Sequence, residues 1–180
     1  MEKTGIMRKK QIFRHEDGFT LIEIIVVLVI LVIAALLAVP MLGSAADMQV
    51  RSAANLIAAD IEYAKSLAIT RQEKFSVVFS TDSDSYEVQD QTGTVIDNPR
   101  RHGYPLEVVF PDDSRVSRVD ITSADFDPDS SQTITFDYLG SPYSGTVSLL
   151  TSGQITLQSD TITMTVNVEP VTGYITITSP

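Results

Sequence analysis

The chain has 180 residues, no cysteine and a formal net charge of −10 at pH 7. Its length leaves room for one globular domain beside a membrane segment, and the core of that domain must form by apolar burial without disulfides. An acidic chain of this kind is not expected to bind nucleic acid. The missing cysteine excludes a thiol nucleophile and thiolate zinc ligands.

A basic leader and a long apolar run open the chain. Residues 1–18 contain five lysines and arginines, and residues 24–42 contain no charged or polar side chain. At 1.5 Å per helical residue, the run is long enough to cross the ~30 Å hydrocarbon core of a bilayer. We therefore predict a transmembrane helix over residues 19–42. The positive-inside rule places the leader in the cytoplasm and the rest of the chain in the periplasm.

Three residues at the start of this run predict how the chain is processed and assembled, namely Gly18, Phe19 and Glu23. Gly18 precedes the apolar run, whereas the small residue of a secretory signal peptide follows it, so a cut between Gly18 and Phe19 would keep the membrane segment. Glu23 lies where an unpaired carboxylate costs a few kcal/mol. It is predicted to neutralise the new Phe19 amino group of a neighbouring subunit. The alternative is an interfacial acid favoured by the helix N-terminus.

Pro40 lies near the end of the apolar run, where it predicts either a kink in a longer helix or a stop. Beyond it, apolar residues recur at helical spacing, which predicts an amphipathic helix over residues 43–70 that continues from the first. The apolar stripe of this helix is expected to pack in the core and consists of Val50, Ala53, Ala54, Ile57, Ile61, Ala64 and Ala68.

Residues 71–180 are predicted to form a β-rich globular domain, because the apolar period changes there from about 3.6 to 2. A turn over residues 169–173 joins the last two strands into a hairpin whose apolar and polar faces alternate. The fold class is α+β, with a long N-terminal helix on an antiparallel sheet. Strands are predicted at 75–79, 85–89, 94–96, 106–110, 115–122, 133–137, 146–151, 154–158, 161–168 and 174–178.

The sequence Gly18-Phe19-Thr20-Leu21-Ile22-Glu23, with its apolar continuation and Pro40, resembles the type IV prepilin-like proteins. These are the type IV pilins and the pseudopilins of type II secretion. The resemblance implies a pilin-like fold, cleavage between Gly18 and Phe19 by a membrane prepilin peptidase, and N-methylation of Phe19. It also implies assembly with other pilin or pseudopilin subunits through Phe19 and Glu23. The chain would then be a single-pass protein of the bacterial inner membrane that enters a filament.

A second resemblance concerns the region after the first helix. The helix end Ala64-Lys65-Ser66-Leu67-Ala68 and the stretch Phe136-Asp137-Tyr138-Leu139-Gly140-Ser141-Pro142 are similar to the GspH/FimT group. This implies a minor pseudopilin of a type II secretion filament that supports protein export. Two alternatives stay open. One is a minor type IV pilin used for adhesion, motility or DNA uptake, and the other is a membrane-anchored periplasmic binding module that does not polymerise.

The residue inventory does not favour an enzyme. His102, the one histidine outside the leader, lies in a loop rich in proline, glycine and arginine. No nucleophile elbow and no phosphate-binding glycine motif occurs in the sequence. Function is therefore expected to rest on association, with no cofactor and no small-molecule substrate.

Two groups of charged residues have an alternative interpretation as binding sites. Asp125, Asp127 and Asp129 are weak candidates for a calcium site, but their surroundings lack the glycine and glutamate of an EF-hand, so solvated acidic turns are favoured. A small basic patch would form if the loops of four arginines converged, although salt bridges within an acidic surface are the favoured interpretation. These arginines are Arg100, Arg101, Arg115 and Arg118.

Overall fold

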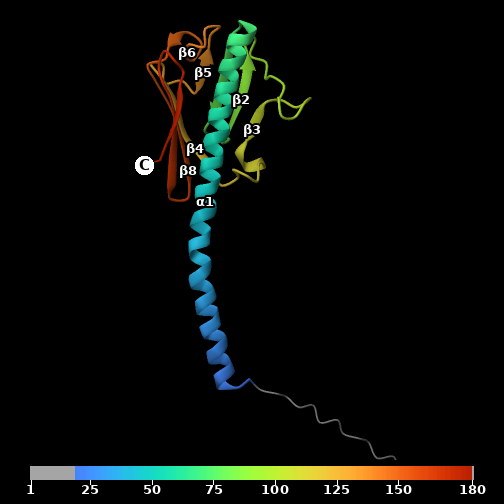
Figure 1. Cartoon of the computed structure of the whole chain (residues 1–180), viewed down its shortest axis with the longest axis vertical. Coiled ribbons are helices and arrows are strands. Elements are labelled where there is room, and N and C mark those ends of the chain that lie inside the picture. The colour runs from blue at the N-terminus through green and yellow to red at the C-terminus, as the bar shows by residue number, and fades with distance from the viewer. Residues whose placement is uncertain (1–18, 180) are drawn as a thin grey trace, which may run out of the picture. The chain divides into compact units, whose positions relative to one another are not determined.

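The computed structural model describes residues 19–179, and it describes side chains in that range outside residues 37–44. The chain divides into two compact units, Met1–Pro40 and Met41–Pro180, which we describe separately as unit 1 and unit 2. One α-helix, α1 (Leu21–Arg71), begins in unit 1 and ends in unit 2 (Figure 1). The helix is continuous through Pro40, so a stop at this proline is wrong, and a kink there stays a prediction.

Among the described residues, no helix combines the length and the hydropathy of a membrane span. The predicted segment over residues 19–42 runs into residues 37–44, whose side chains lie outside the described ones. The leader, residues 1–18, lies outside the described residues as well.

Unit 2 contains two antiparallel sheets beside α1. The six-stranded sheet has the order β3-β2-β1-β5-β6-β7, and the four-stranded sheet has the order β10-β9-β8-β4. The strands are β1 (Phe75–Ser80), β2 (Ser85–Asp90), β3 (Glu107–Val109), β4 (Asp120–Asp127), β5 (Thr133–Phe136), β6 (Pro142–Ser144), β7 (Ser148–Leu149), β8 (Ser152–Ser159), β9 (Ile162–Val168) and β10 (Ile175–Thr178). A short 3-10 helix, Phe110–Asp112, follows β3.

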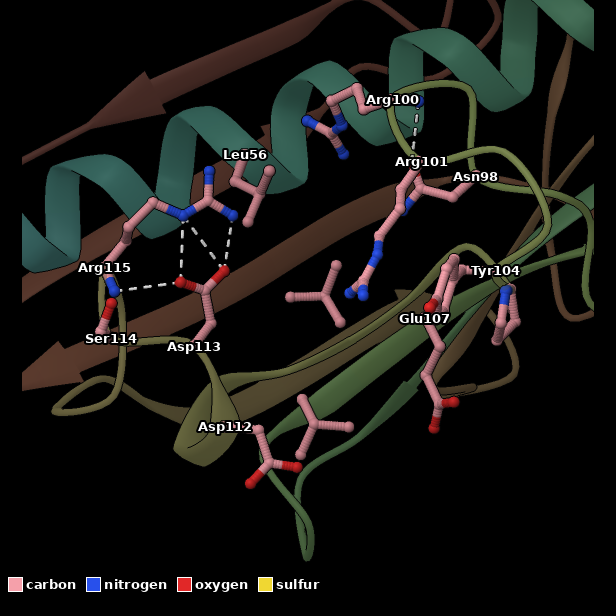
Figure 2. Close-up of a pocket in the computed structure, with 13 residues that line it drawn as sticks. Leu56, Asn98, Arg100, Arg101, Tyr104, Glu107, Asp112, Asp113, Ser114 and Arg115 are labelled. Atoms are coloured by element: carbon pink, nitrogen blue, oxygen red, sulfur yellow. Dashed lines mark hydrogen bonds and ion pairs between the residues drawn. The ribbon is translucent and has the colours of Figure 1, made fainter.

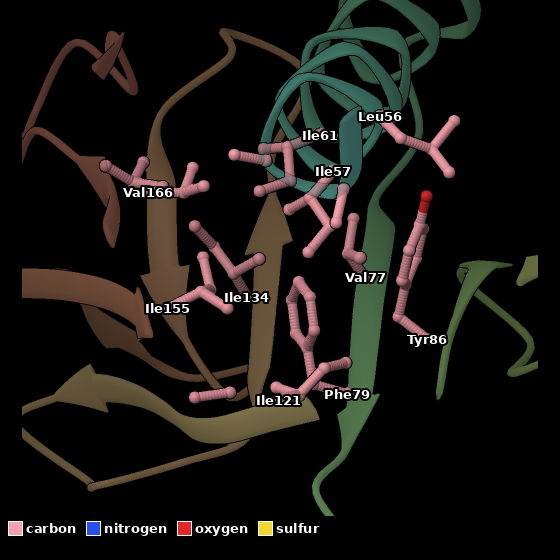
Figure 3. Close-up of a cluster of buried hydrophobic side chains, with 14 of the residues drawn as sticks. Leu56, Ile57, Ile61, Val77, Phe79, Tyr86, Ile121, Ile134, Ile155 and Val166 are labelled. Carbon is pink, nitrogen blue, oxygen red and sulfur yellow. The ribbon is translucent and has the colours of Figure 1, made fainter. Parts of the chain in front are cut away.

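The core of unit 2 lies between the inner faces of α1 and the two sheets. All seven residues of the predicted apolar stripe of α1 are fully buried. Figure 3 shows Ile57 and Ile61 of α1 packed towards Phe79 of β1, Ile134 of β5 and Ile155 of β8. The buried hydrophobic side chains of the described chain all lie between residues 46 and 168. Unit 2 therefore holds a core of its own, and we expect residues 41–180 to fold alone.

Most of the predicted strands are confirmed. The six predicted at 75–79, 85–89, 133–137, 154–158, 161–168 and 174–178 correspond to β1, β2, β5, β8, β9 and β10, with ends that differ by at most two residues. The C-terminal hairpin is also confirmed, because β9 pairs with β10 and the Glu169 N–H donates to the Tyr174 carbonyl at 2.8 Å.

Four predicted strands differ from the structure because local turns replace extended chain. Residues 94–96 make only an isolated bridge between Gln89 and Val95, since the Asp90 carboxylate accepts N–H bonds and bends the chain. The strand predicted at 115–122 begins at Asp120, because a turn at Asp113 precedes it.

The other two predicted strands are shorter in the structure. The strand predicted at 106–110 is reduced to β3 before the 3-10 helix. The one predicted at 146–151 is reduced to β7, and its partner β6 was not expected because Pro142 follows a glycine-serine pair typical of a turn.

Candidate functional site

Both predicted assembly residues, Phe19 and Glu23, lie at the start of α1. Phe19 is 79% exposed and precedes the helix, while Glu23 lies exposed in its first turn. Thr20 caps α1, because its hydroxyl accepts the Glu23 backbone N–H at 3.3 Å. Gly18 lies outside the described residues. The pairing of Glu23 with a neighbouring Phe19 therefore stays a prediction.

The cap at Thr20 is a feature of the helix start that sequence analysis missed. Thr20 and Glu23 have the spacing of a capping box, in which an acid three residues into the helix supports the capping residue. A carboxylate in the first turn also interacts favourably with the helix dipole. The Thr-x-x-Glu pattern that is typical of a capping box was visible in the sequence.

A buried carboxylate on α1 links the helix to strand β2 and to the loop that contains Arg100. Asp60 is 3% exposed, and its side chain accepts the Tyr86 hydroxyl of β2 at 2.6 Å and the Arg100 guanidinium at 2.7 and 2.9 Å. Burial raises the pKa of the Tyr86 hydroxyl well above its usual range, and the nearby Asp60 charge raises it further. Tyr86 therefore stays a neutral hydrogen-bond donor, and Arg100 fixes its loop to the helix.

That loop borders a groove of about 750 Å³ on the edge strand β3 (Figure 2). The groove has apolar walls from Leu56 of α1 and Val108 of β3. Arg101 extends into it, with its guanidinium carbon 3.6 Å from the centroid of the Tyr104 ring. The groove is lined by three basic and three acidic side chains, so its lining favours no ligand of one charge; these are Arg100, Arg101, Arg115, Glu107, Asp112 and Asp113.

The structure brings three of the four candidate arginines to this groove. Arg100, Arg101 and Arg115 line it, whereas Arg118 is not among its lining residues. Arg115 donates to Asp113, and this hydrogen-bonded ion pair lowers the pKa of the Asp113 carboxyl. Two of the three arginines are thus paired with aspartates, as the salt-bridge interpretation predicted. His102 is exposed in the same loop.

The calcium candidates do not form one loop. Asp125 and Asp127 lie in β4, and only Asp129 lies in the turn that follows, so their prediction as an acidic turn is wrong for two of the three. Over residues 19–179, no group of three or more acidic or histidine side chains is arranged to hold a metal ion. Asp84, another acid, lies in the turn before β2 and has a structural contact, because its carboxylate accepts the Ile121 N–H of β4 at 2.8 Å.

Two loops meet at the end of unit 2 where α1 terminates. In the loop over residues 137–141, the Asp137 carboxylate accepts the N–H groups of Leu139 and Ser141, both at 2.9 Å. In the loop over residues 169–174, the Gly173 carbonyl accepts the Lys65 ammonium of α1 at 3.2 Å. The stretch from Phe136 to Pro142, which carries the second resemblance, therefore belongs to a junction of helix, strand and loop that these hydrogen bonds hold together.

Gly173 fits this junction tightly, and we expect Gly173→Ala to lower the free energy of unfolding of residues 41–180 by about 2–4 kcal/mol. Its φ is +58°, and a Cβ would lie 2.9 Å from the buried Phe136 ring. Gly103→Ala is the matched control, because Gly103 has φ of +82° with no atom within 4 Å of a Cβ. It should cost only about 1 kcal/mol. Equal losses in urea titrations would contradict the steric argument.

Comparison with known proteins adds independent evidence. Residues 53–172 match the family model described as Type II transport protein GspH, and residues 13–39 match the prokaryotic N-terminal methylation motif. The second match contains Gly18, Phe19 and Glu23. No curated protein matches the chain at a significant level.

Two solved structures share similarity with the chain at low sequence identity. The type IV minor pilin FimU of Pseudomonas aeruginosa is 15% identical with a TM-score of 0.47, and the match covers 73% of this chain and 92% of FimU. The minor pseudopilin EpsH from the Type 2 Secretion System of Vibrio cholerae is 10% identical with a TM-score of 0.47, and the match covers 73% of this chain and 98% of EpsH. The family model, by contrast, spans well over half of the 180 residues. The chain therefore belongs to the family of the type II transport protein GspH.

Proposed function

We propose that the chain is a minor pseudopilin subunit of a type II secretion filament. The observation that carries the proposal is the occurrence of two matches in one chain, the GspH model over residues 53–172 and the N-terminal methylation motif over residues 13–39. The subunit acts by association with other pseudopilins rather than by catalysis, and the filament supports protein export.

Maturation and anchoring follow the order of the N-terminal segments. Prepilin peptidase cuts between Gly18 and Phe19 and removes the basic leader, and Phe19 is then methylated. The apolar run over residues 24–42 holds the subunit in the inner membrane before assembly, with unit 2 in the periplasm. During assembly, Glu23 pairs with the Phe19 amino group of a neighbouring subunit. The exposed positions of Phe19 and Glu23 before and within the first turn of α1 support this role.

Mass spectrometry of the membrane-extracted full chain tests the maturation step. We expect an N-terminus at Phe19 that carries one methyl group. Gly18→Val should leave the leader attached, because a β-branched side chain replaces the small residue at the cut. A conservative change beyond the cut, Thr20→Ser, is the control and should be processed normally. An intact Met1 in the unsubstituted chain, or a cut after Leu42, would defeat the proposal.

A further inference from the structure

Strand β3 is an edge of the six-stranded sheet, and its outer side presents backbone groups to the groove. The Leu106 carbonyl and the Phe110 N–H, which flank β3, bond to β2 and to the residue before it, at 3.0 and 2.9 Å. Backbone groups of successive residues in a strand point to opposite sides, so those of Glu107 and Val109 point away from β2. An edge of this kind is a template for a strand of another chain.

The other sheet edges of the described chain carry features that hinder strand pairing. β7 has two residues, and β4 has a bulge between Ile121 and Ser123 and two exposed acids, Asp120 and Asp125. Short strands, bulges and charges are the means by which proteins protect their edges. β3 is also short, with three residues, but it borders the groove. The apolar walls of the groove would receive the side chains of an added strand.

The loop over residues 98–104, which we term the guard loop, lies beside this edge and is held in place (Figure 2). The Asn98 N–H donates to the Tyr104 carbonyl at 2.8 Å, and the Tyr104 N–H donates to the Arg101 carbonyl at 3.2 Å. Arg100 joins the loop to α1 through the buried Asp60 carboxylate, at 2.7 and 2.9 Å. The guard loop is therefore closed by its own hydrogen bonds and attached to the helix.

The Arg101 side chain extends from the guard loop into the groove and lies against the Tyr104 ring (Figure 2). A strand that entered the groove would have to displace this guanidinium or bury it, and burying a charge without a partner is costly. Glu107 and Asp112 also line the groove and are exposed, so an added strand would cover their carboxylates as well. Charged side chains that point into the path of an added strand protect an edge.

We infer that the guard loop is a lid that keeps the β3 edge from pairing with β3 of a second copy of the chain. Arg101 fills the groove, and the Asp60–Arg100 ion pair holds the loop over it. Without the lid, two edges would pair antiparallel about Val108, because Glu107 of one copy and Val109 of the other would then exchange backbone hydrogen bonds. The inference concerns unit 2 alone and does not depend on the proposed function.

Disulfide trapping in intact cells tests the inference with the full chain, which has no cysteine of its own. In the edge-to-edge pair, the two Val108 residues would lie directly opposite with Cα atoms about 4.5 Å apart, within reach of a disulfide. We expect Val108→Cys alone to give little linked dimer after mild oxidation. Adding Arg101→Ala should raise the yield about fivefold or more, and adding Arg100→Ala about threefold, because the groove is emptied or the loop released.

Three controls separate the lid from a general loosening of unit 2. Arg101→Lys should keep the yield low, because lysine also places a charge at the edge. Arg118→Ala removes an arginine that does not line the groove and should leave the yield unchanged. Gln158→Cys, exposed on β8, reports random collision and should give the same low yield with and without Arg101→Ala.

Three results would overturn the inference. The first is a high dimer yield from Val108→Cys with the guard loop unsubstituted, because the edge would then be open already. The second is an unchanged yield on adding Arg101→Ala, or a rise that Gln158→Cys shows equally. The third is a yield with Arg101→Lys as high as that with Arg101→Ala, because the charge at the edge would then have no effect.

Discussion

Glu23→Ala is expected to reduce incorporation of the chain into filaments at least tenfold, while the amount of methylated subunit in the membrane stays unchanged. Glu23 lies beside a run of apolar residues, where an unpaired carboxylate costs a few kcal/mol and a partner of opposite charge is needed. The Phe19 amino group of a neighbouring subunit supplies that charge in a medium of low dielectric constant. Crosslinking in intact cells, followed by quantification of the subunit in crosslinked filament assemblies, measures the effect.

Glu23→Gln separates assembly from helix capping. Thr20 caps the helix through the Glu23 backbone N–H, and the spacing of the two residues is that of a capping box, in which glutamine also occurs at the position of the acid. If charge pairing matters, Glu23→Gln should be as defective as Glu23→Ala. If Glu23→Gln assembles normally and Glu23→Ala does not, Glu23 acts through the cap and the charge-pair hypothesis is wrong. Glu62→Ala, an exposed acid later on α1, is the control and should assemble normally.

The sequence was sufficient to predict a helix or strand where one side-chain period repeats over many residues. The buried stripe of α1 follows the 3.6-residue period from Val50 to Ala68 without exception. The hairpin of β9 and β10 follows the two-residue period, with Met164, Val166 and Val168 buried. These elements were predicted nearly to their ends, because every residue in them gives the same signal.

Prediction failed where single side chains bend the backbone. The Asp90 carboxylate accepts the N–H groups of Thr92 and Thr94, and this turns the chain at a place where alternation predicts a strand. Asp113 does the same before β4 through the Arg115 N–H. A single acid in a short segment has too little weight in a periodic pattern to reveal such a turn.

The burial of Asp60 could be predicted from the sequence, but the hydrogen-bond partners of this acid could not. Asp60 lies three residues after Ile57 and four before Ala64, so the helical period places this acid on the buried face of α1. A buried acid requires a donor, which was the missed signal. Its partners, Tyr86 and Arg100, are 26 and 40 residues away, and only the fold brings them together.

Asp60→Ala is expected to lower the free energy of unfolding of residues 41–180 by about 2–4 kcal/mol. The substitution removes the acceptor of a buried Tyr86 hydroxyl, leaves a small cavity and releases the Arg100 loop from α1. Arg100 itself is 50% exposed, so water can solvate its charge and the loss stays below that of a fully buried pair. Urea unfolding followed by circular dichroism measures the difference.

Asp47→Ala is the matched control, because Asp47 is likewise an acid of α1 that pairs with an arginine, Arg51, but it lies at the surface. The side chains of Asp47 and Arg51 are 40% and 55% exposed, so the loss should be under about 1 kcal/mol. Tyr86→Phe in the background of Asp60→Ala should cost almost nothing further, because the unpaired hydroxyl is then removed. Strictly additive losses for Asp60→Ala and Tyr86→Phe would show that the two side chains do not stabilise unit 2 through their 2.6 Å hydrogen bond.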